Sequence, residues 1–182
     1  MSVSASDVFP KILTVRAPGE AHALLARLRG SAELTVSRLQ DLIKRETDPL
    51  RILSQLKFEP VGCDPLSPAR RLNVIEQLNQ IFTYQASFQA AALLLEKYPE
   101  HAPLVLNLGT SSGTDIESED GEVVAEVFAA VDPRNNRKLA KEIERLRLRA
   151  APFRYVFYLS PKCGGKGDEF EVDGISIRRL CP

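Results

Sequence analysis

The chain has 182 residues, which is long enough for one domain that buries its own hydrophobic core. Its 44% hydrophobic and 26% charged residues are typical of a globular protein and exclude a largely disordered chain. Lys plus Arg and Asp plus Glu both number 24, so the formal net charge is zero. This balance argues against a protein that binds polyanions through bulk charge, although a local basic patch could still bind nucleic acid.

The three cysteines, Cys63, Cys163 and Cys181, lie far apart in the chain and form no C-x-x-C pair. With only two histidines beside them, a structural zinc site is not expected, and we predict three reduced thiols. The N-terminus lacks the basic start and apolar run of a signal peptide. The least charged stretch, residues 72–95, is too rich in Asn and Gln to span a membrane. We therefore expect a cytoplasmic protein with no membrane partner.

Residues 19–46 predict two short amphipathic helices, because leucine and isoleucine recur there at helical spacing. Gly30 and Ser31 are the expected break between them, and Asp48 with Pro49 ends the second helix.

A loop rich in proline follows between residues 58 and 69. Residues 1–68 are therefore interpreted as an N-terminal helical extension with its loop, and residues 69–182 as an α/β core. About 60 residues of short helices form a marginal core alone, so we expect both parts to belong to one compact domain.

The periodicity after this loop changes from helical to alternating and back again. The dipeptide formed by Asp120 and Gly121 between two apolar runs is a strong signal of a β-hairpin. In chain order we expect a helix at about 72–97, strands at 103–108, 114–118 and 122–131, a helix at about 135–149, a strand at 153–159 and a final β-segment within 170–180. This order predicts a mixed α/β fold.

The hairpin turn also predicts which residues face one another. With Asp120 and Gly121 at the centre of the turn, Asp115 lies opposite Glu126. Opposed residues have Cβ atoms roughly 4.5–5.5 Å apart and point to the same face, on which Glu117 is the next position. The second strand of the hairpin is apolar on both faces, so we expect it to be central and Glu126 to be at least partly buried.

Two opposed carboxylates in a partly buried place repel each other. Either one of them binds a proton or both share a cation, and oxygen ligands of this kind suit Mg²⁺ or Mn²⁺. The alternative is that Asp115 and Glu126 both face solvent at a sheet edge, held apart or paired with an arginine.

A third carboxylate, Glu76, is the only charged side chain within residues 72–95. A helix so free of charge is expected to be buried, and a lone carboxylate on it needs a partner. A salt bridge to Arg70 or Arg71 near the helix start is the simpler alternative to a functional role. The polar stripe around Glu76 at helical spacing consists of Asn73, Gln77, Gln80 and Thr83.

A helix with Glu76, then Asp115 directly after Gly113 and Thr114, then a hairpin to Glu126, a helix and a strand resembles the PD-(D/E)XK nuclease superfamily. The resemblance spans roughly residues 70–160 and implies a restriction-endonuclease-like α-β-β-β-α-β core with an N-terminal helical extension. It implies that Asp115 and Glu126 bind Mg²⁺ or Mn²⁺ that activates water for phosphodiester cleavage, with DNA as the expected substrate. Glu76 is similar to the helix carboxylate that some members add.

The chain departs from this pattern at Phe128, which stands where the motif has a lysine. Some members supply the lysine from the next helix. Lys138 lies at the flank of the buried direction of that helix, whereas Lys141 points nearly opposite, so Lys138 is the expected substitute. Its alternative is a solvated lysine. Without a substitute, the chain would be a catalytically inactive nuclease-fold module that binds nucleic acid or a protein partner.

Basic residues concentrate in residues 134–149, which carry seven of them against Glu142 and Glu144. Such a helix beside a metal site could hold a phosphate backbone. An exposed helix with pairs such as Lys138 and Glu142 explains the pattern equally well. We expect nucleic acid as the partner, and cutting both strands of a duplex would favour a homodimer.

Overall fold

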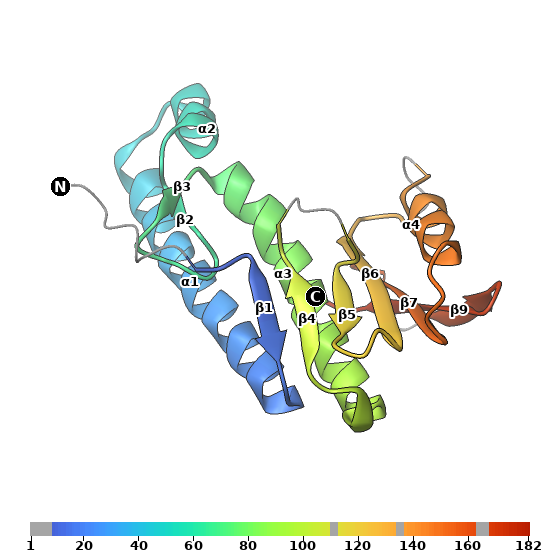
Figure 1. The fold of residues 1–182 in the computed structure, drawn as a ribbon. Helices are drawn as coiled ribbons and strands as arrows, with labels where there is room; N and C mark the ends of the chain where they lie inside the picture. Colours follow the sequence, from blue (N-terminus) through green and yellow to red (C-terminus); the bar gives the residue numbers. More distant parts are fainter. Residues whose placement is uncertain (1–8, 110–112, 134–136, 163–167) are drawn as a thin grey trace. The chain divides into compact units, whose positions relative to one another are not determined.

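The structure, a computed structural model, describes residues 9–109, 113–133, 137–162 and 168–182. The chain forms two compact units (Figure 1), and each is described by itself. The first comprises residues 1–10 and 23–81, and the second comprises residues 11–22 and 82–182. Neither unit begins or ends at residue 69, the boundary that the sequence suggested.

Helix α1 (Pro18–Arg45) is continuous, so the prediction of two short helices is wrong. Gly30 has open space where a side chain would be, and the hydroxyl of Ser31 donates a hydrogen bond to the Leu28 carbonyl one turn back (2.8 Å). A glycine inside a helix costs only about 1 kcal/mol, which the packing of a long helix offsets.

Helix α2 (Pro49–Phe58) was not predicted from the sequence. Asp48 caps it by accepting a hydrogen bond from the Leu50 N–H (2.9 Å), and Pro49 stands in the first turn, where its missing N–H costs nothing. The Asp48 and Pro49 pair therefore starts a helix as well as separating it from α1.

The core of the first unit is organised around Gln77, one of the polar residues on helix α3 (Val74–Lys97). Its Oε1 accepts hydrogen bonds from the Thr35 hydroxyl (2.7 Å) and the Cys63 N–H (2.9 Å). Cys63 belongs to β2 (Gly62–Cys63), which pairs with β3 (Arg71–Leu72). A Cβ at Gly62 would lie 2.5 Å from the Gln77 Oε1, so only glycine allows this close approach.

The second unit is built on a mixed sheet whose described strands follow the order β1-β4-β5-β6-β7-β9-β8. Strands β1, β4, β5 and β6 are antiparallel neighbours, β6, β7 and β9 are parallel, and β8 is antiparallel to β9. Their bounds are Ile12–Val15 for β1, Leu104–Asn107 for β4, Ile116–Ser118 for β5, Val123–Ala129 for β6, Phe153–Leu159 for β7, Glu169–Val172 for β8 and Ile175–Leu180 for β9. The mixed α/β class is confirmed.

Strands β4 to β7 lie within the predicted ranges, whereas β1 was not predicted. The final β-segment is a hairpin of β8 and β9, with Asp173 and Gly174 at its turn in the left-handed backbone region (φ 52° and 71°). A short 3₁₀ turn, η2 (Pro99–His101), follows α3 before β4.

Strand β6 is central in the sheet, as predicted. Helix α4 (Lys138–Arg147) packs over one face of β6, β7 and β9 (Figure 1), where Phe128, Ile143, Leu146 and Ile177 belong to one apolar cluster. On the opposite face the end of α3 contacts β7, because Tyr155 accepts a hydrogen bond from Lys97 (2.8 Å). A strand of a parallel pair that is covered on both faces needs apolar side chains on both, and β6 has such a sequence.

Two further expectations concern the cysteines and membranes. Cys63 is buried and free, whereas Cys181 is disulfide-bonded, so the prediction of three reduced thiols is wrong. Distance along the chain does not limit the distance between two cysteines in a fold; Cys163 lies outside the described residues. None of the helices in the described part of the chain combines the length and apolar character of a membrane span.

Candidate functional site

The predicted hairpin register is confirmed. Ile116 pairs with Ala125 and Glu117 with Val124, and the next position in this register sets Asp115 against Glu126. The two acidic side chains are hydrogen-bonded to each other. This is the register expected with Asp120 and Gly121 at the centre of the turn, whereas a three-residue loop would have shifted it.

Glu126 is 2% exposed, in the middle of the central strand. This excludes the alternative in which it faces solvent at a sheet edge. Asp115 is half-buried, and its position is held by the backbone on both sides. Its Oδ2 accepts a hydrogen bond from the Val127 N–H (2.7 Å), and its carbonyl accepts one from the Asn107 N–H (2.8 Å). Backbone hydrogen bonds therefore hold the Asp115 carboxylate beside Glu126.

The electrostatics of the pair follow from burial and repulsion. Burial, and then the charge of Asp115, raises the pKa of Glu126 to about 8, and nearby Glu142 adds to the rise. Burial also raises the pKa of Asp115, while the Val127 N–H opposes that shift. Near neutral pH the two carboxyl groups therefore hold a proton between them, which a cation could replace.

A third acidic residue, Glu142 on α4, lies beside this pair and was missed as a site residue. Its side chain is buried, and its charge raises the pKa of both Asp115 and Glu126. Glu142 pairs with Lys138 and with Arg145 (3.0 Å), and Arg145 also lies 3.9 Å from Glu126. The sequence does indicate that Glu142 is buried, because it lies one turn before Leu146 on the same face of the helix.

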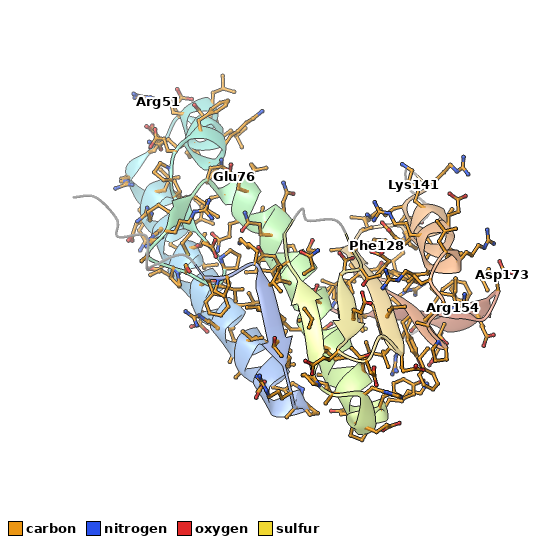
Figure 2. All side chains as sticks on the ribbon, viewed as in Figure 1. Arg51, Glu76, Phe128, Lys141, Arg154 and Asp173 are labelled. Carbon is orange, nitrogen blue, oxygen red and sulfur yellow. The ribbon has the colours of Figure 1, made fainter. Side chains whose placement is uncertain are left out.

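Lys138 lies in the first turn of α4, and its role as the substitute lysine stays a prediction. Its ammonium lies 5.7 Å from the centre of the Phe128 ring and pairs with Glu142, and its charge lowers the pKa of Asp115. Lys141 is exposed on the outer side of the helix, away from Phe128 (Figure 2). A lysine of α4 thus places its ammonium over the face of the Phe128 ring.

Glu76 does not behave as expected. It is exposed in the first turn of α3 and belongs to the first compact unit, so its role in the site stays a prediction. Arg70 pairs with Asp64 (3.1 Å) and Arg71 donates to the Pro60 carbonyl (2.8 Å), so neither forms the expected salt bridge. An acidic residue in the first turn of a helix is also stabilised by the helix dipole, without any partner.

Among the other described basic residues of α4 and its flanks, Arg137 pairs with Glu144 of the helix (4.0 Å), and two arginines pair with acids of other elements. Arg147 pairs with Asp173, and Arg149 pairs with Glu117, whose carboxylate also accepts a hydrogen bond from Thr114 (2.8 Å). Arg134 lies outside the described residues. The pair of Lys138 and Glu142 that the alternative named is present, and Arg145, Arg147 and Arg149 also reach acids in the sheet and its turns.

No family model matches the chain, and neither a curated protein nor a solved structure matches it.

The donor set permits a restricted kind of metal site. Among the described residues, no group of three or more His, Cys, Asp and Glu side chains could hold an ion. The Asp115 and Glu126 pair offers two carboxylates, which fits a cation that keeps several waters and is completed by a substrate phosphate. Mg²⁺ and Mn²⁺ match this description, whereas zinc with its histidine and thiolate preference does not.

Proposed function

We propose that this chain is a divalent-metal-dependent nuclease that hydrolyses phosphodiester bonds, with DNA as the expected substrate. The observation that carries the proposal is the hydrogen-bonded pair of Asp115 and Glu126, buried in a sheet with the Lys138 ammonium close by. The order α3-β4-β5-β6-α4-β7 supports it, because this is the order of a restriction-endonuclease-like core.

The two carboxylates would hold Mg²⁺ or Mn²⁺. Their buried pairing costs free energy while they share a proton, and a divalent cation would relieve both the repulsion and the desolvation. When bound, the metal would supply Lewis-acid activation of water and of the phosphate. The backbone hydrogen bonds to Asp115 keep its carboxylate in place for this task.

Lys138 would stabilise the charge that develops on the phosphate. Its ammonium is held by Glu142 and by the face of the Phe128 ring, so it need not be ordered when substrate binds. Phe128, 4% exposed and stacked on Tyr158 (5.9 Å between ring centres), forms the dry floor beneath it. A lysine reaching in from α4 thus replaces one that would project from β6.

The second candidate is a catalytically inactive module of the same fold that binds nucleic acid or a protein partner. Two observations favour it: Phe128 stands at the motif position, and Lys138 pairs with Glu142. A lysine whose charge is balanced by a carboxylate attracts a substrate phosphate less strongly.

Thermal melting in Mn²⁺ tests the metal site. Millimolar Mn²⁺ should raise the melting temperature of the wild-type protein, since a ligand that binds only the folded state stabilises it. Asp115→Asn and Glu126→Gln should each abolish the rise, while Glu76→Gln tests whether that carboxylate contributes. No rise in the wild-type protein would remove the metal site and the nuclease proposal together.

Cleavage of plasmid DNA in Mg²⁺ or Mn²⁺ then separates the two candidates. We expect Lys138→Gln to lower the rate by roughly 100-fold or more, as loss of one charge-stabilising donor does, and Lys141→Gln to change it little. Metal binding without any cleavage would favour the inactive module.

A further inference from the structure

Glu142 is a buried carboxylate that holds two cations at once. Only 2% of the residue is exposed, yet it pairs with the Lys138 ammonium and with the Arg145 guanidinium (3.0 Å). These three residues lie at successive turns of one face of α4, so the helix brings their side chains together. The carboxylate is therefore the fixed point of a small charged cluster.

Burying such a charged cluster costs desolvation free energy, which indicates a role besides stabilising the fold. An apolar residue at position 142, above the apolar cluster of Ile143 and Leu146, would cost no desolvation. What Glu142 achieves in return is the fixed position of the two cations.

Both cations keep one side open to solvent. The Lys138 side chain is 45% exposed and the Arg145 side chain is 64% exposed, although each is tied to the same buried carboxylate. The Arg145 guanidinium also lies 3.9 Å from Glu126, so the open sides border the candidate metal site. An ammonium and a guanidinium side by side, each with unused N–H donors, suit the oxygens of one phosphate group.

We propose that Glu142 is a positioning residue that holds Lys138 and Arg145 as a receptor for one phosphate of the nucleic-acid backbone. The receptor would seat that phosphate next to Asp115 and Glu126. The inference rests on the proposed function, whose substrate it specifies, but it makes a claim about binding that needs neither metal nor cleavage.

The competing explanation is that α4 attracts nucleic acid by its overall charge. The two explanations predict opposite effects of Glu142→Gln on the affinity for nucleic acid. If bulk charge acts alone, Glu142→Gln removes a negative charge and binding of a polyanion becomes tighter. If Glu142 positions the cations, the same substitution lets them disperse into solvent and binding becomes weaker.

The test is the binding of a short fluorescein-labelled DNA duplex in EDTA, followed by fluorescence anisotropy over a range of salt concentrations. We expect Lys138→Gln and Arg145→Gln each to weaken binding roughly tenfold and to lower the salt slope by about one. Lys141→Gln, on the outer side of the same helix, should cost less than about twofold. Glu142→Gln should weaken binding, whereas the exposed control Glu144→Gln should leave it equal or slightly tighter.

Tighter binding by Glu142→Gln would overturn the proposal, as would a cost for Lys141→Gln equal to those of Lys138→Gln and Arg145→Gln. Failure of the wild-type protein to bind the duplex would overturn it too. If Glu142→Gln does not fold, the comparison of the three cation variants decides, since all three positions are exposed. The Mn²⁺ melting shift depends on Asp115 and Glu126, so failure of the metal site is recognised separately.

Discussion

At the Asp115 and Glu126 pair, burial and repulsion act on the pKa of Glu126 in the same direction. Because the folded protein raises this pKa from 4.5 to about 8, it holds a proton that the unfolded chain has already lost. The associated stability is fully present below pH 4.5 and is lost as the pH rises to about 8. The site thus weakens the fold in the pH range where a metal would bind.

Glu126→Gln should remove this dependence, because glutamine mimics the protonated acid at every pH. We expect the free energy of unfolding of the wild-type protein to fall relative to the variant between pH 4.5 and about 8, by up to about 1.4 kcal/mol per pH unit. Urea unfolding at several pH values measures the difference, in which groups outside the pair, such as His101, cancel, so that it reports the coupled titration of Glu126 and Asp115. Parallel curves for the two proteins would show that Glu126 carries no raised pKa.

At the scale of single elements, α4 is positioned by a few apolar residues on one face. Leu146 is fully buried against the sheet, whereas Leu148, two residues later, is 87% exposed. The helical period separates these two leucines by more than half a turn, which the sequence pattern already predicts. The same period carries Glu142 to the buried side with Leu146.

Leu146→Ala should lower the free energy of unfolding by about 2–5 kcal/mol, because it leaves a cavity under the helix. Leu148→Ala, the matched control, should change it by less than about 0.5 kcal/mol. Denaturant unfolding monitored by circular dichroism gives both values. Equal effects of the two substitutions would mean that α4 does not pack on the sheet through the face described.

Much at this scale could be predicted from the sequence. The turn residues Asp120 and Gly121 determine the register of the hairpin, and the apolar run from Val123 indicates a central strand. Helix α2 and strand β1 were not predicted, because each is short and its pattern is weak beside its flanks. Strand β1 acquires its structure by pairing with β4, a contact between residues about 90 positions apart.

On the scale of the whole molecule, the chain divides differently in space than along the sequence. Residues 11–22 join the sheet of the second unit, while residues 23–81 form the first unit. The edge of β4 is therefore covered by β1, from the segment that the sequence assigned to the N-terminal extension.

A fragment of residues 69–182 should therefore associate or aggregate, although it contains the whole predicted core. Without β1, strand β4 presents a free row of backbone donors and acceptors. Size-exclusion chromatography with light scattering should find the full chain in a defined state and the fragment in larger, heterogeneous species. A monomeric fragment that unfolds cooperatively would show that β1 is dispensable.

The mixed α/β class, the hairpin register and the opposition of Asp115 and Glu126 could be predicted from the sequence alone, because turn chemistry and side-chain alternation are local properties. The sequence also indicated that Lys138 would lie nearer the buried face than Lys141, since a helix repeats every 3.6 residues. The burial of Glu142 with its two cations, the exposure of Glu76 and the place of β1 were decided only by the tertiary structure. Each of these depends on contacts between distant parts of the chain, and a local pattern cannot reveal which contacts form.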